Sequence, residues 1–474
     1  MIEISKLYNK FNEALTWNSV LFIINKVSKT ILTILLYNRL TSLDFSLWAN
    51  IYSIIFIVLL WGNFGFSRSL PQYCLVFSKN GMTKLLFLKK VIIFRVFVSL
   101  IVSLSLFYFA PKILFFLKLP YESKILGLGC FLFIVEDIKS VIRLIFYSYF
   151  WQKQFNFLEA ITVIIHSLIV FIGINSLNSS TKILKLVFIS DIFIGMLLIL
   201  ITSFRFKDLL KDKNYSITQK INTNQLGKDF IVHSALMWGL ITINSLTERN
   251  FLIPFLTYTL GAPLANIFKV ANDGALLFQR FIVKTIGTTG TSLFAHLETK
   301  QIDITINELF IKLSKRIIVL TVILFGIIVV MMLQLWGVSS KIVQAFLLLT
   351  SLYLIQITFM ASERILEVKR NYKALIISFL PYLGILGIFI FGYFRSISSD
   401  LLTLLFLIHL IRILSLSLRV YYAQKLHHVY FPTLFFITAL CTSILVAFVI
   451  NFMFNLFNIS LGQIFLLSII KAAN

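Results

Sequence analysis

The segment LTSLDFSLWANIY at residues 40–52 has a partial copy, LTYTLGAPLANIF, at residues 256–268. Five residues are identical at a constant separation of 216 positions, and an aromatic residue, Tyr52 or Phe268, ends each copy. Each copy lies at the start of the second span in an apparent set of six apolar runs. An even number of spans separates the copies, so the two sets share one orientation. The repeat predicts two related, parallel halves, and transporters built this way place the substrate path between the halves.

The composition predicts an all-α integral membrane protein. The chain is 59% hydrophobic, and its mean hydropathy is +0.93. Many apolar runs exceed the ~18 residues that distinguish a membrane helix from a buried helix of a soluble protein. These runs are continuously apolar, whereas the strands of a membrane barrel alternate over ~10 residues. Residues 1–16 carry several charges and lack a small-residue cleavage site, so we expect a retained first span.

The apolar runs predict about fourteen transmembrane helices. The first six lie near residues 17–36, 45–61, 86–109, 124–150, 155–174 and 183–201, and the second six near 230–246, 262–283, 311–336, 342–360, 374–393 and 401–421. Two more lie near 431–454 and 456–470, and the last is short enough to be interfacial, which would leave thirteen spans. The predicted domains are an N-terminal six-helix bundle, a cytoplasmic linker, a C-terminal six-helix bundle and additional C-terminal helices, at residues 1–203, 204–229, 230–422 and 423–474.

The basic residues predict the orientation of the chain. Lys and Arg concentrate at the N-terminus and in the even-numbered loops, so we expect the N-terminus and the linker from Arg205 to Lys228 to be cytoplasmic. The net charge of +24 would suggest nucleic acid for a soluble protein. In a membrane protein, anionic headgroups and an anionic substrate are the expected partners, and we expect no nucleic acid.

The predicted eighth span carries a polar stripe. Asn266, Lys269, Asp273 and Arg280 fall within about 60° of one another at ~100° per residue. The repeat places Asn50 of the second span at the position of Asn266. Charge within hydrocarbon is costly, so each such residue is a functional hypothesis. The alternative is that Lys269 and Asp273, one turn apart, neutralise each other.

The first span also carries cations well inside its apolar run. Asn18, Asn25 and Lys29 share a face, and Lys26 lies beside it. Cations near span ends extend to the headgroups, but these lysines lie deeper. We therefore expect Lys26 and Lys29, like Lys269, to face a polar cavity.

The fourth span carries charges of both signs. Glu136, Lys139 and Arg143 share one face, with Asp137 adjacent. One interpretation is an internal pair that fastens this helix to its bundle. The other is that Glu136 and Asp137, together with Asp273, are carboxylates that couple transport to a proton or sodium gradient. The residues alone leave both open.

The sign of the intramembrane charge predicts the substrate class. Lysine offers a point charge and arginine a fork for phosphate oxygens, so a basic cavity suits a phosphorylated or acidic substrate. His166, His233 and His409 lie on different spans without ligand spacing, so we expect no metal site. No catalytic triad or nucleotide-binding loop has a usable context, so we expect no enzyme activity and no cofactor.

The segments LYNRLTSLDFSLW at residues 36–48 and LWGNFGFSR at residues 60–68, with QKQF at 152–155, resemble those of known flippases. The chain is similar in these segments, and in architecture along its whole length, to polysaccharide exporters of the multidrug/oligosaccharidyl-lipid/polysaccharide (MOP) superfamily, particularly Wzx-type O-antigen and capsule flippases. It departs at Phe45–Ser46, where the family often has an aromatic residue followed by glycine.

This resemblance implies a fold and a substrate. Two six-helix bundles would form a V around a central cavity. The protein would translocate an undecaprenyl-pyrophosphate-linked oligosaccharide, an O-antigen or capsule repeat unit of lipopolysaccharide or polysaccharide biosynthesis, across the bacterial inner membrane by alternating access. A polysaccharide polymerase and a chain-length regulator would be protein partners. The cations that would meet the pyrophosphate or glycan are Lys26, Lys29, Arg68, Arg249, Lys269 and Arg280, and the polar lining would include Asn25, Asn50 and Asn266.

Other functions remain open at this point. A multidrug exporter of the same fold would need an acidic cavity instead of a basic one. A membrane glycan polymerase or ligase would be expected to place catalytic residues on a sizeable extracytoplasmic loop, and the odd-numbered loops are short. A structural scaffold would leave the central charges unexplained.

Overall fold

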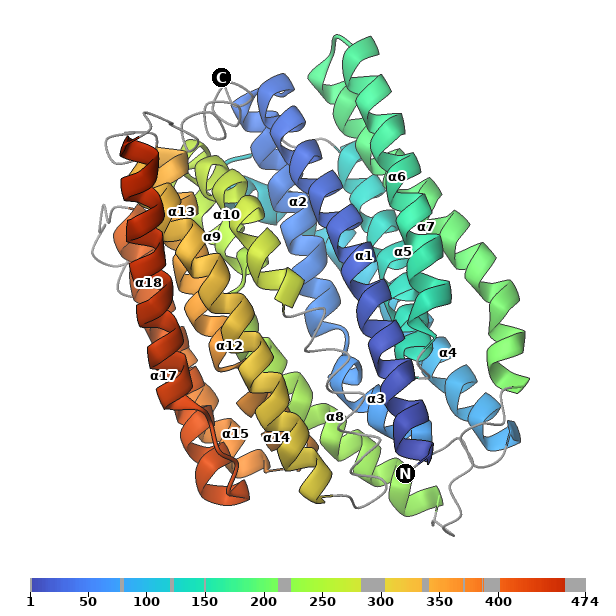
Figure 1. The fold of residues 1–474 in the computed structure, drawn as a ribbon. Helices are drawn as coiled ribbons and strands as arrows, with labels where there is room; N and C mark the ends of the chain where they lie inside the picture. Colours follow the sequence, from blue (N-terminus) through green and yellow to red (C-terminus); the bar gives the residue numbers. More distant parts are fainter. Residues whose placement is uncertain are drawn as a thin grey trace. The chain divides into compact units, whose positions relative to one another are not determined.

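The computed structural model describes residues 2–76, 81–119, 123–148, 151–211, 223–282, 303–334, 341–369, 371–385, 387 and 401–456. Within these ranges the chain is helical and contains no strand (Figure 1). The first nine helices of these ranges are α1 (Ile2–Arg39), α2 (Ser42–Trp61), α3 (Phe66–Val76), α4 (Gly81–Phe116), α5 (Ser123–Ser148), α6 (Gln152–Ser176), α7 (Ser180–Lys211), α8 (Thr223–Ser245) and α9 (Arg249–Leu260). The later ones are α10 (Ala262–Ile282), α12 (Asp303–Gln334), α13 (Lys341–Thr358), α14 (Met360–Val368), α15 (Tyr372–Phe379), the 3-10 helix η3 (Leu380–Tyr382), α17 (Leu401–His427) and α18 (Thr433–Leu456).

The helices confirm the all-α membrane class. Eight described helices are long and apolar enough to cross a membrane, and α8 with α9, bent by 41° at their junction, would make a ninth. Helices α1, α5 and α10 also have spanning lengths of 38, 26 and 21 residues, but they carry the intramembrane charges. The protein is therefore a multi-pass membrane protein.

The predicted spans agree with these helices as far as the description reaches. Each predicted span up to residue 454 overlaps a helix, whereas the last one, 456–470, lies outside the described residues except for Leu456. Three short helices were not predicted: α3, α9 and α14. Each directly follows or precedes a longer helix, and the apolar pattern alone cannot separate a broken helix from a span with a loop.

The contacts between helices divide the chain into two compact units. Unit 1 comprises residues 1–32 and 40–258, and unit 2 comprises residues 33–39 and 259–474. The division differs from the predicted domains, because α8 and most of α9 belong to unit 1 and the last turns of α1 belong to unit 2. The predicted linker at residues 204–229 is thus not where these units divide, and it is described only in part. The related halves of the chain stay a prediction.

Unit 1 is built around α5, which packs against α2, α3, α4 and α7. Its apolar core includes Leu70, Tyr73, Ile145, Phe146 and Phe155. The turn from α2 to α3 needs a glycine, because Gly65 has a φ of +76° and a side chain there would lie 2.1 Å from the Ser234 carbonyl oxygen. This close approach joins the α2–α3 turn to α8.

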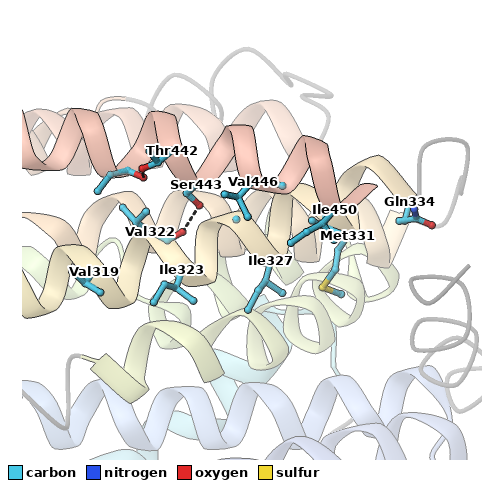
Figure 2. A pocket seen from close by; sticks show the side chains of 14 residues that line it. Val319, Val322, Ile323, Ile327, Met331, Gln334, Thr442, Ser443, Val446 and Ile450 are labelled. Carbon is cyan, nitrogen blue, oxygen red and sulfur yellow. Dashed lines mark hydrogen bonds between the residues drawn. The ribbon is translucent and has the colours of Figure 1, made fainter. Parts of the chain in front are cut away.

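Unit 2 is built on two helix pairs, α10 with α13 and α12 with α18. The break before α10 lies at Gly261, whose φ of +85° suits glycine. Residues of α12 and α18 line a groove of about 620 Å³, most of whose side chains are apolar, with Gln334 at one end (Figure 2). Two of the lining residues join the helices, because the Ser443 hydroxyl of α18 donates to the Val322 carbonyl oxygen of α12 at 2.7 Å (Figure 2).

Candidate functional site

Charged side chains from α1, α5, α6 and α7 meet inside unit 1. We call this set the unit 1 cluster, and its members are Lys29, Glu136, Lys139, Arg143, Glu159, His166 and Asp191, with Tyr52 of α2 beside them. The i, i+3, i+7 spacing on α5 puts the three central members on one helix face. The face that Glu136, Lys139 and Arg143 were predicted to share is therefore present, and it forms part of the larger unit 1 cluster.

One ion pair of the cluster lies within α5, and a second connects α5 to α6. Lys139 donates to Glu136 within α5, and Arg143 donates to Glu159 across to α6. The Arg143 guanidinium also lies 5.6 Å from the centre of the Phe155 ring. The Arg143 side chain is 27% exposed whereas that of Glu159 is 5% exposed. The cation of this pair is thus more accessible than its carboxylate.

Asp191 on α7 joins three helices. The Tyr52 hydroxyl of α2 donates to Asp191 Oδ2, and His166 Nε2 of α6 lies 3.0 Å from Asp191 Oδ1. The Asp191 side chain is 26% exposed. A single half-buried carboxylate therefore holds α2, α6 and α7 at one level of the unit.

Lys29 is the exposed cation of the cluster. Its side chain is exposed, although it lies within a long helix. The ammonium group interacts electrostatically with the carboxylates of Glu136, Asp191 and Glu159 and with the Lys139 cation. Three cations and three carboxylates thus share the site. The sequence predicted Lys29 and the shared face of Glu136, Lys139 and Arg143, and the structure adds the carboxylates of Glu159 and Asp191.

Asp137 lies outside this cluster, in a buried pair with Arg95 of α4. Both side chains are almost inaccessible, at 2% and 1% exposure. Arg95 also donates to the Gly62 carbonyl oxygen, and the Ser99 hydroxyl donates to the second Asp137 oxygen. The adjacent residues Glu136 and Asp137 therefore face different surroundings, one a half-exposed cluster and the other a buried ion pair.

The polar stripe of α10 lies in unit 2. Lys269 donates to Asp273 Oδ2 one turn along the helix, and the Thr33 hydroxyl of α1 donates to the same oxygen at 3.0 Å. The neighbouring Asn272 is fully buried and accepts a hydrogen bond from the Tyr353 hydroxyl of α13 at 2.5 Å. The predicted neutralising pair is present, and Asn266, Lys269 and Asp273 are all buried.

Asn50, the counterpart of Asn266 in the repeat, is fully buried in unit 1. Its amide nitrogen donates to the Ser46 carbonyl oxygen at 2.8 Å and to the Thr257 hydroxyl at 3.0 Å. Asn50 thus holds α2 against α9.

The remaining predicted site residues are spread along the helices. Asn25 on α1, Arg68 on α3 and Arg249 at the start of α9 are half-buried. Arg249 Nε donates to Asn250 Oδ1 at 3.3 Å. The side chains of Lys26 and Arg280 lie outside the described residues, although both positions are helical.

Sequence reasoning overlooked Glu159 and treated His166 and Asp191 as scattered residues. The sequence held a signal for Glu159 and His166, because Glu159, Thr162 and His166 follow the i, i+3, i+7 pattern of one helix face. In the structure all three are buried. Nothing in the sequence paired this face with Arg143 or Asp191, since that pairing depends on how α5, α6 and α7 pack. Among the described residues no group of His, Cys, Asp and Glu could hold a metal ion.

The chain matches no protein-family model, and no curated protein matches it. Solved structures of similar fold are transporters. A multidrug resistance MATE family transporter of the MOP superfamily, in an outward-facing conformation, aligns over 88% of this chain and 96% of its own, with a TM-score of 0.62 and 10% identity. The Vibrio cholerae MATE transporter VcmN in the bent form aligns over 94% of this chain and 99% of its own, with a TM-score of 0.59 and 11% identity. The eukaryotic MATE transporter AtDTX14 aligns over 92% of this chain and 100% of its own, with a TM-score of 0.63 and 13% identity.

These likenesses cover nearly the whole chain at low identity, so they show the fold. The class is a multi-pass helical membrane protein with the fold of these solved structures. That fold is the one found in MATE transporters of the MOP superfamily.

Proposed function

We propose that this protein is a flippase that moves an undecaprenyl-pyrophosphate-linked oligosaccharide across the bacterial inner membrane by alternating access. The observation that carries the proposal is the set of cations within the spans, in particular the exposed Lys29 and the half-exposed Arg143 of the unit 1 cluster. Cations at this depth are costly unless they have a function or a partner. Pyrophosphate and acidic sugars are the ligands that lysine and arginine recognise best.

The paired charges suggest how such a site would release its ligand. A phosphate that binds Lys139 or Arg143 must displace Glu136 or Glu159, which now accept from them. Since the carboxylates compete with the substrate, its affinity is reduced and binding stays reversible. A ligand moves a conformational equilibrium only through its different affinities for the two states, so moderate and state-dependent binding suits transport.

The proposal also includes the source of energy for transport. A proton or sodium gradient would drive the cycle, and no cofactor would be needed. Of the three carboxylates predicted for ion coupling, Glu136 lies in the unit 1 cluster, Asp273 pairs with Lys269, and Asp137 is sealed against Arg95. Their surroundings favour Glu136 over Asp137, because coupling requires access for the ion.

A multidrug exporter is the second candidate, and two observations favour it. The structural neighbours include a multidrug resistance transporter, and the unit 1 cluster contains the carboxylates Glu136, Glu159 and Asp191, which could hold a cationic drug. The exposed Lys29 disfavours it, because a cation beside these carboxylates repels a cationic ligand.

The decisive experiment is deletion of the gene, followed by analysis of surface glycan and of the sidedness of lipid-linked intermediates. We expect surface glycan to be lost and the intermediate to accumulate on the cytoplasmic leaflet. Complementation with Lys29→Ala should fail, whereas Lys112→Ala, which removes an exposed cation outside the cluster, should complement. Normal glycan together with increased sensitivity to cationic drugs would reject the flippase and favour the exporter. A polymerase and a chain-length regulator would be the expected partners, with the N-terminus in the cytoplasm.

A further inference from the structure

A second feature of unit 1 lies at the contact of α4, α5 and α7. A cavity of about 200 Å³ is lined there by Ile92 and Val96 of α4, Val141 of α5, and Ile199 and Thr202 of α7, among others. It is mostly apolar and lies apart from the unit 1 cluster, since none of that cluster's charged side chains lines it.

One buried polar atom belongs to a residue that lines this cavity. Arg95 is almost completely buried, and its Nε is a buried donor with no hydrogen-bond partner among the described residues. The charge of Arg95 is already balanced by Asp137. An unsatisfied buried donor costs free energy, so the site favours a ligand that brings a neutral acceptor, such as an ester carbonyl.

Cations stand one helical turn outside the cavity on both of its outer helices. Lys89 precedes Ile92 by three residues and Val96 by seven on α4, so it lies near the face that lines the cavity. Arg205 follows Thr202 by three residues on α7, so it lies one turn beyond a lining residue, at the edge of that face. Both side chains are exposed. The apolar spans begin at Leu88 and end at Arg205, which places both cations at the level of the headgroups.

The features follow one another in the order of the parts of a phospholipid. The cations of Lys89 and Arg205 lie at the headgroup end. Arg95 lies six residues beyond Lys89, or about 9 Å further along the helix at 1.5 Å per residue. The apolar wall of Ile92, Val96 and Ile199 surrounds that position. We propose that this crevice binds one anionic phospholipid, with its phosphate at Lys89 and Arg205, an ester carbonyl at Arg95 Nε and the start of an acyl chain in the cavity.

This site is independent of the proposed function, because it makes no use of the transported substrate. Basic pockets between membrane helices at the headgroup level are suited to anionic lipids, and each cation near such a headgroup contributes about a five-fold factor in affinity. Removal of both cations should therefore weaken binding about 25-fold.

The test is native mass spectrometry of the purified protein titrated with phosphatidylglycerol, phosphatidylcholine of the same chains, or glycerol phosphate. The variant Lys89→Gln with Arg205→Gln should lose about 25-fold in phosphatidylglycerol affinity. Its matched control, Lys90→Gln with Lys112→Gln, removes two exposed cations of α4 that lie off the lining face or at its other end, and should stay within two-fold of the parent protein. Equal losses in both variants would overturn the site, because they would reflect general surface charge.

Two further arms separate the parts of the proposal. Val96→Phe fills the cavity without changing charge and should also weaken phosphatidylglycerol binding, whereas undiminished binding would overturn occupation of the cavity. If Val96→Phe does not fold, the charge variants and the comparison of lipids still test whether the site binds an anionic phospholipid. Glycerol phosphate or phosphatidylcholine binding as tightly as phosphatidylglycerol would overturn the assignment to an anionic phospholipid.

Discussion

The Asn50 amide nitrogen donates a hydrogen bond to the Thr257 hydroxyl at 3.0 Å, and the two residues come from different copies of the repeated segment. Thr257 is the counterpart of Thr41, which caps α2 in the first copy. In the second copy the threonine lies inside α9 instead, where its hydroxyl also donates to the Ile253 carbonyl oxygen at 2.9 Å. The same residue type thus starts a helix in one copy and joins two helices in the other.

Loss of this contact should have a small, measurable effect on stability. Thr257→Val keeps the shape of the side chain and removes the hydroxyl, while Asn50 keeps its bond to Ser46. Hydrogen bonds between membrane helices contribute about 0.6 kcal/mol on average, so we expect a loss of about 0.5–1 kcal/mol in the free energy of unfolding. Thr257→Ser should stay close to the parent protein in a thermal or denaturant unfolding assay. A loss above about 2 kcal/mol would show that the contact does more than join α2 to α9.

The Arg95–Asp137 pair should prove structural. Asp137→Asn leaves the buried Arg95 charge uncompensated, which costs about 3–5 kcal/mol. Replacement of both residues by leucine removes both charges and should recover most of the stability, as measured by unfolding in detergent. If Asp137→Asn were instead stable but inactive in transport, the carboxylate would be a coupling residue.

The Lys269–Asp273 pair of unit 2 allows stability and function to be separated. Lys269→Ala or Asp273→Asn alone strands one buried charge, so each should lower protein abundance, and the double variant should restore it. If Lys269 also binds phosphate, the double variant should be stable yet inactive in glycan export. Full export by the double variant would make this pair purely structural.

Lys29 should be required for export without being required for folding. Its side chain is exposed, so Lys29→Ala should leave protein abundance near normal. Loss of a charged hydrogen bond to phosphate, worth about 1.5–3 kcal/mol, predicts at least a ten-fold drop in the export rate. Lys29→Arg should keep part of the activity because the charge remains. Unchanged export by Lys29→Ala would remove this residue from the proposed site.

The predicted orientation can be measured by labelling cysteines on intact cells with an impermeant maleimide, after the native thiols are removed. A cysteine at Ser179, between α6 and α7, should react, and one at Asn214 in the basic linker should not. The positive-inside distribution of Lys and Arg is the physical basis for this result. The reverse labelling pattern would show that the chain has the opposite orientation in the membrane.

The sequence by itself determined the long helices and the charges that they carry. Long apolar runs fix membrane helices, and helical periodicity fixed the shared face of Glu136, Lys139 and Arg143 and the contact of Lys269 with Asp273. Both results depend only on spacing along one helix, so neighbouring positions in the sequence are sufficient to predict them.

Only the tertiary structure decided which helices share those charges. Arg143 meets Glu159, Asp191 meets Tyr52 and His166, and Asp137 meets Arg95, and each pair crosses between helices. In a membrane protein the lipid-facing and the buried faces of a helix are both apolar, so the pattern of apolar residues does not reveal which face packs inward. The packing of α8 and most of α9 in unit 1 was decided in the same way.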